Sequence, residues 1–61
     1  MNTKQIGFFQ NDGIEQTLGA ARVEFANAHP QVTITGAKIV AASPGRPSEG
    51  RWVTIEVTYE E

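Results

Sequence analysis

One segment near the end of the chain, residues 51–59, alternates strictly between two kinds of side chain. The apolar set, which could face a hydrophobic core, is Val53, Ile55, Val57 and Tyr59. The opposite set is Trp52, Thr54, Glu56 and Thr58. Because successive side chains of a strand point to opposite faces, this pattern predicts a β-strand with one buried face. The other face then presents the only tryptophan of the chain. A domain this small has no further helix or strand to cover that side chain.

The length of the chain limits how much surface it can bury. A domain of 61 residues buries only roughly 60% of the surface that its unfolded chain exposes. The chain has no cysteine for a disulfide or a thiolate metal site, and one histidine argues against a structural zinc site. We therefore predict a single domain, residues 1–61, without a metal, which gains further burial by forming a homo-oligomer.

Charge and hydropathy narrow the set of partners. The net charge is −2 and the five Lys and Arg residues are spread along the chain, whereas nucleic-acid binders carry a basic patch. We expect no nucleic acid polymer as partner. No apolar run approaches the ~20 residues of a membrane span, and residues 1–4 do not resemble a signal peptide. We expect no membrane contact and a cytoplasmic location.

A helix is predicted between two breaks, the turn residues 11–13 and Pro30. Asp12 is a good N-cap and Glu15 follows three residues later, as in a capping box. One buried stripe is expected, because five apolar residues fall within about 40° of one line at 100° per residue. They are Ile14, Leu18, Ala21, Phe25 and Ala28. Pro30 ends the helix and leaves His29 as a partly exposed C-terminal residue.

Three strands are predicted, one before this helix in the sequence and two after it. Residues 4–10 form a short strand with Ile6 and Phe8 on one face, and residues 32–42 form a long strand rich in β-branched residues. Gly36 interrupts that strand and predicts a bulge, and residues 43–50 form a loop with two prolines and two glycines. The fold class is therefore α+β: β-α-β-β order, a three-stranded antiparallel sheet and one helix packed on one face.

Two surfaces lack an internal partner in this arrangement. Phe9 joins Trp52 on the uncovered sheet face, because the helix covers the other one. The strand of residues 32–42 adds either Lys38, Val40 and Ala42 or, if the bulge shifts the register, their neighbours, and Val40 grouped with Trp52 and Phe9 would make an apolar patch. The helix surface opposite the stripe has small residues with little charge, at Gly19, Val23 and Ala26. Alanine there could reflect helix propensity alone, but glycine costs up to about 1 kcal/mol inside a helix. We take both surfaces as candidate oligomer interfaces.

The residues of this chain are better suited to a ligand-binding site than to a catalytic site. No nucleophile and base are grouped in the sequence, so we predict no enzymatic activity. Trp52 offers a ring on which a base or flavin could stack, or else it fills an oligomer interface. Arg51, Arg46 and Lys38 could contact a phosphate, while Glu56 and Thr54 could hydrogen-bond a base edge or ribose.

The chain resembles two families over its whole length. The β-α-β-β order and the segment Glu56-Val57-Thr58-Tyr59 are similar to the dodecins, which hold flavins between curved sheets. This resemblance implies a flavin cofactor and places Trp52 on the ligand-lining face. The segment of residues 32–34 has no tryptophan, where dodecins stack the flavin. Residues 25–30 and the ending Tyr59-Glu60-Glu61 resemble a small sporulation-associated family that is also found in phages.

The sequence thus predicts a small homo-oligomer that binds and sequesters an aromatic or nucleotide-like ligand at subunit interfaces. By analogy of size, fold and charge placement, it could be a sponge for a nucleotide signal, such as phages use against bacterial defence. One alternative is dodecin-like flavin storage. The other is a structural or protein-interaction module without a small ligand.

Overall fold

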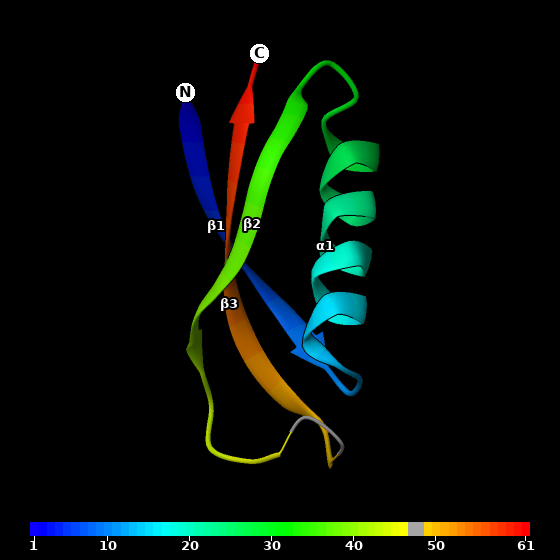
Figure 1. The fold of residues 1–61 in the computed structure, drawn as a ribbon, viewed down its shortest axis with the longest axis vertical. Helices are drawn as coiled ribbons and strands as arrows, with labels where there is room; N and C mark the ends of the chain where they lie inside the picture. Colours follow the sequence, from blue (N-terminus) through cyan, green and yellow to red (C-terminus); the bar gives the residue numbers. More distant parts are fainter. Residues whose placement is uncertain (47–48) are drawn as a thin grey trace.

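The computed structural model describes residues 1–46 and 49–61 and confirms the predicted β-α-β-β order. The elements are β1 (Asn2–Gln10), α1 (Ile14–Ala28), β2 (Thr33–Ala42) and β3 (Arg51–Glu60). The strands form one sheet in the order β1-β3-β2, with β3 antiparallel to both neighbours. Helix α1 lies along one face and carries the chain from one sheet edge to the other, and both termini lie at the same end (Figure 1).

The core forms where the middle of α1 meets the central strand. Among the described residues, the buried apolar ones of this core come from two elements, Ala21 and Phe25 from α1 and Val53, Ile55 and Val57 from β3. Half-buried residues from β1 and β2, among them Ile6, Phe8 and Ile39, complete it. The alternation predicted for β3 is confirmed, because burying one face of the central strand removes the most apolar area from water.

The start of α1 differs from the predicted capping box. The N-cap is Gly13 rather than Asp12, and no side chain of the described residues caps the helix. The Asp12 carboxylate accepts a hydrogen bond from the adjacent Gly13 N–H at 2.8 Å, so it is turned away from the N–H groups inside the first turn. Thr17 instead ties this turn together, since its hydroxyl donates to the Gly13 carbonyl at 2.9 Å. Helix α1 therefore begins at Ile14.

The predicted apolar stripe is buried only in its middle. Ala21 and Phe25 are buried and Leu18 is half-buried, but Ile14 is 54% exposed and Ala28 is exposed. The two end positions were predicted wrongly because periodicity assumes a sheet as long and straight as the helix. Figure 1 shows β2 diverging from α1 toward the N-terminal end of the helix. Thr17, a polar residue, is buried in this region instead.

Two irregularities in β2 set which of its residues face away from the helix. The bulge predicted at Gly36 is confirmed, because the register shifts between Ile34 and Gly36. A second shift, between Ile39 and Ala41, was not predicted and places Ala42 opposite the buried Val53. In the loop of residues 43–50, Pro47 and Ser48 lie outside the described residues. Within the described ranges, no helix is both long and apolar enough to cross a membrane.

Candidate functional site

The sheet face turned away from α1, which we call the outer sheet face, is ordered in four rows across the strands. Residues directly opposite each other on neighbouring strands share a face, so the pairing register defines the rows. From the hairpin-loop end to the terminal end, the rows are Phe9–Trp52, Gly7–Thr54–Ala41, Gln5–Glu56–Lys38 and Thr3–Thr58–Gly36. Large aromatic side chains thus occupy one end of this face and small residues the other.

Phe9 and Trp52 form an aromatic shelf at the hairpin-loop end. Their rings are 5.4 Å apart at an interplanar angle of 71°, an edge-to-face pair, and they remain 47% and 61% exposed. Gly50 lies against the Phe9 ring so closely that a Cβ at position 50 would be 2.6 Å from Phe9 Cζ. Gly50 also has a φ of 86°, which favours glycine. The backbone therefore holds Phe9 in place, and Phe9 holds the edge of Trp52.

Replacing Gly50 by alanine tests how the aromatic shelf is held. We expect Gly50→Ala to lower the free energy of unfolding by about 1–3 kcal/mol, because a left-handed non-glycine residue is strained and its methyl group displaces the Phe9 ring. Urea unfolding measures the loss. Gly19→Ala is the matched control, since a Cβ there meets no atom within 4 Å and alanine favours the helix. Equal stability of both variants with the wild type would contradict this geometry.

The polar part of the outer sheet face lies next to the aromatic shelf. Lys38 Nζ is 3.5 Å from Glu56 Oε2, and their side chains are 72% and 25% exposed. An ion pair this exposed contributes at most about 1 kcal/mol to stability, so both groups can rearrange around a ligand. Thr54 occupies the row between this pair and Trp52. Four of the predicted ligand residues, Trp52, Thr54, Glu56 and Lys38, thus share one face.

The two arginines of the predicted site are placed differently from Trp52. Arg51 lies on the helix side, because neighbouring residues in a strand alternate, and its Nε donates to Gln10 Oε1 at 2.7 Å. Gln10 is fully buried and also donates to the Asp12 carbonyl at 3.1 Å. Arg51, predicted to contact a phosphate, thus has its Nε engaged on the side of the sheet opposite Trp52. Arg46 is exposed in the loop at the same end of the sheet as Trp52.

The predicted interface residues divide between opposite sides of the molecule. Phe9 belongs to the outer sheet face, and Val40, at the second bulge of β2, is 42% exposed. Gly19, Val23 and Ala26 are exposed on α1, which covers the other side of the sheet. One partner could not contact both groups at once. The outer sheet face is the surface that combines aromatic, polar and charged side chains.

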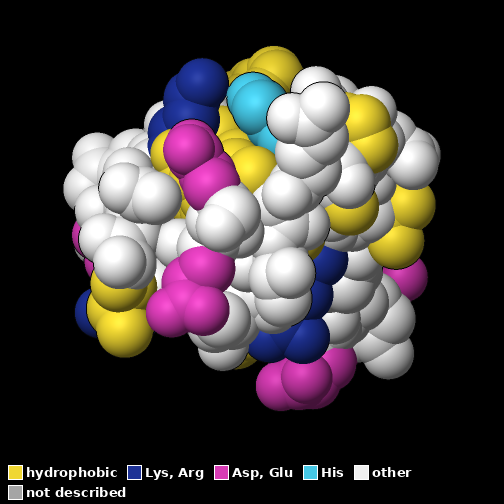
Figure 2. All heavy atoms as spheres, turned by 90° about the horizontal axis from the view of Figure 1, so that it is seen from above, with side chains coloured by type: hydrophobic (Ala, Val, Ile, Leu, Met, Phe, Trp, Pro, Cys, Tyr) yellow, Lys and Arg dark blue, Asp and Glu magenta, His cyan; other side chains and the backbone are white. Residues whose placement is uncertain are grey.

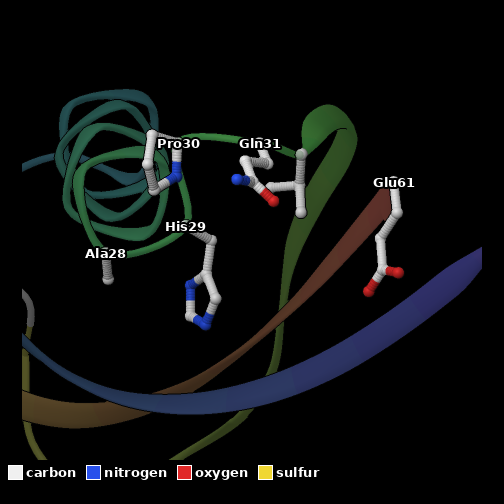
Figure 3. A pocket seen from close by; sticks show the side chains of 6 residues that line it. Ala28, His29, Pro30, Gln31 and Glu61 are labelled. Atoms are coloured by element: carbon white, nitrogen blue, oxygen red, sulfur yellow. The ribbon is translucent and has the colours of Figure 1, made fainter.

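A shallow hollow of about 420 Å³ lies at the other end of the molecule, where α1 ends. The residues that line it are Ala28, His29, Pro30, Gln31, Val32 and Glu61. His29, Gln31 and Glu61 border it from three directions (Figure 3), and the histidine side chain lies among hydrophobic ones (Figure 2). The His29 ring stacks on Phe25 at 4.5 Å. Sequence reasoning missed this contact, although the spacing of four residues on a helix was the signal for it.

Neither surface has the groups of a metal centre. Among the described residues, no three His, Asp or Glu side chains lie close enough together to hold a metal ion. Comparison with protein-family models, with curated proteins and with solved structures found no match. The function therefore has to be inferred from the residues of this chain, and the outer sheet face is where they are best arranged for binding.

Proposed function

We propose that this protein is a small, non-enzymatic homo-oligomer that binds and sequesters an aromatic or nucleotide-like ligand on its outer sheet face. The aromatic shelf supports the proposal most strongly. A tryptophan that is 61% exposed, yet held at its edge by Phe9 and through Phe9 by Gly50, offers a ring in a fixed orientation. Stacking a base on such a ring contributes about 1–3 kcal/mol to binding.

The rows beside the shelf supply the polar contacts of the proposed ligand. The Thr54 hydroxyl and the Glu56 carboxylate lie one and two rows from Trp52 and can hydrogen-bond a base edge or a ribose. Lys38, two rows away on β2, and Arg46, in the loop, are the cations proposed to contact a phosphate. Arg51 is left out of this set because its Nε is bonded to Gln10 on the helix side.

We propose binding without catalysis because the four rows of this face place no nucleophile beside a base. The Glu56 carboxylate is paired with Lys38, and Thr54 has neither a histidine nor a free carboxylate in its row. A general base needs a reactive group within hydrogen-bond reach. The outer sheet face therefore suits a ligand that is held and released unchanged.

Fluorescence of the single tryptophan tests this proposal directly. Saturable quenching by ATP, with weaker quenching by uncharged adenosine, is the expected result, since both stack but only ATP offers phosphates to Lys38 and Arg46. N-acetyltryptophanamide serves as the control for collisional quenching. Quenching by flavin mononucleotide but not by ATP would favour the alternative, a flavin-binding protein. If neither ATP nor flavin mononucleotide quenches Trp52 more than it quenches N-acetyltryptophanamide, the proposed function is wrong.

Removing the charge of Lys38 should distinguish the contribution of the phosphates to affinity from that of the base. We expect Lys38→Ala to weaken ATP binding about fivefold and to leave adenosine binding almost unchanged, because one exposed charge contact contributes up to about 1 kcal/mol. Titration of Trp52 fluorescence provides both affinities. Lys4→Ala is the matched control, because Lys4 pairs with Val57 and so shares the helix side of the sheet. An equal loss in both variants would show only a general effect of net charge.

A further inference from the structure

We infer that the free edge of β1 pairs antiparallel with β1 of a second copy, so that two three-stranded sheets join into one sheet of six strands. This inference rests on the homo-oligomer of the proposed function and names the surface through which it forms. The two-fold axis passes beside Ile6, which lies opposite Ile6 of the other copy. On the outer sheet face, Phe9 then lies opposite Thr3 of the other copy. Each copy thus supplies a hydroxyl group beside the aromatic shelf of the other.

The two edges of the sheet differ in how well they are protected against pairing. Strand β1 pairs with β3 in unbroken register over nine residues, and it contains no proline. Strand β2 has two register shifts, and bulges interrupt the row of backbone hydrogen-bonding groups and bend a strand. Among the described residues, no backbone hydrogen bond from a turn or loop reaches β1. The edge of β1 is therefore the one to which a further strand can add.

A small hollow of about 130 Å³, which we call the edge hollow, lies between β1 and the C-terminal half of α1. Its lining includes Lys4, Ile6 and Gly7 of β1 and Glu24, Phe25 and Ala28 of α1. Ile6 and Phe8, the apolar residues of β1 that pack against the core, are only half-buried. A strand added to β1 would cover the apolar area that the single chain leaves at this edge.

The sequence of β1 is complementary to itself in one antiparallel register. Residues opposite each other in such a pair share a face, and pairing all of Asn2–Gln10 in both copies sets Ile6 against Ile6. On the helix side, Phe8 of each copy then lies opposite Lys4 of the other. Because Lys4 lines the edge hollow, the ring of Phe8 from the other copy can fill that hollow. The same contact forms twice about the axis, as an isologous interface requires.

Neither charge nor the size of the contact opposes this pairing. Lys4 is the only charged residue of β1. The two Lys4 side chains are about 13 Å apart along the strands, beyond the Debye length of about 8 Å at physiological salt. Nine paired residues form about eight to ten backbone hydrogen bonds between the copies. The contact therefore does not depend on buried apolar area alone.

Sedimentation equilibrium of the wild type measures association, and pairs of cysteine variants test the register. The chain has no cysteine, so each introduced thiol is unique. Gln5→Cys and Gly7→Cys lie opposite each other in the dimer, with Cα atoms about 4.5–5.5 Å apart, within the range of a disulfide. In a glutathione buffer, their mixture should cross-link about tenfold faster than a mixture of Gln5→Cys and Ala41→Cys, since only the first pair is held in disulfide geometry. Ala41 is the matched control because it shares the row of Gly7 but lies on the β2 edge.

Both β1 variants should fold, since Gln5 is exposed and a Cβ at position 7 meets no atom within 4 Å. Far-UV circular dichroism confirms it, and the mass of the wild type needs no variant.

A wild type that reaches the mass of a dimer, with the faster cross-linking of Gln5→Cys to Gly7→Cys, supports the inference. Masses that grow beyond the dimer, with faster cross-linking to Ala41→Cys, would show β1 pairing with β2 in an open chain of copies and would overturn it. A dimer in which neither mixture cross-links faster contradicts the β1 register. A monomer at every concentration rules out the second copy at this edge. Failure of the proposed function is a separate result, because saturable quenching of Trp52 by ATP requires only one copy.

Discussion

Replacing Phe25 by alanine should leave most of the protein unfolded without any denaturant. Phe25 is buried in the core of five apolar residues and packs between His29, with ring centres 4.5 Å apart, and Tyr59, at 5.2 Å. Removing a buried phenylalanine costs about 3–5 kcal/mol. A domain of this size rarely has more than about 3–5 kcal/mol of stability from its core. The substitution therefore removes about as much as the fold has.

Far-UV circular dichroism and urea unfolding measure this effect, with Ile14→Ala as the control. Ile14 belongs to the same apolar pattern in the sequence, but it is 54% exposed in the structure. We expect Ile14→Ala to change the free energy of unfolding by less than about 1 kcal/mol, since most of the side chain is already in water. Equal losses from the two variants would mean that α1 packs along its whole stripe, contrary to the structure.

Replacing Trp52 by alanine should have the largest effect on binding. The loss of a stacked ring lowers affinity by about 1–3 kcal/mol, which corresponds to about 5- to 150-fold weaker binding of ATP. Stability should fall by at most about 1.5 kcal/mol, the contribution of an aromatic pair, because the ring is mostly exposed. Titration calorimetry is the suitable measurement, since this variant has lost the only tryptophan of the chain.

Two further variants distinguish the effect of the Trp52 ring on ATP affinity from the effect of truncating any exposed apolar residue. Trp52→Phe keeps an aromatic face, so it should retain part of the affinity that Trp52→Ala loses. Val23→Ala truncates an exposed apolar residue on the helix side and should leave ATP binding unchanged. Unaltered affinity in Trp52→Ala would show that the ligand binds elsewhere, for example in the hollow beside His29.

The order and pairing of the elements could be predicted from the sequence because the strongest signals are periodic. Residues 51–59 alternate without a break, so one face of β3 had to be buried, and β3 is the central strand. Gly36 marked the first bulge correctly, since glycine inside a strand often does. Pro30 likewise placed the end of α1, which has His29 as its C-cap.

What escaped prediction depends on side-chain choices that a pattern does not encode. The Asp12 carboxylate could accept a hydrogen bond from the first turn of the helix or from the N–H of Gly13. The path of the backbone into α1 determines that it accepts from Gly13. The second bulge has no glycine to mark it, so Val40 could not be given a face in advance. The hydrogen bond from Arg51 to Gln10 joins two strands, and the sequence does not show which residue of β1 lies opposite Arg51.

The emission of Trp52 during titration with ATP tests most directly whether the outer sheet face is the functional surface. Stacking of the base on the ring removes part of the indole from water, so we predict saturable quenching that Lys38→Ala moves to higher ATP concentrations. Emission that changes no more than that of N-acetyltryptophanamide, in the wild type and in Lys38→Ala alike, would contradict the account.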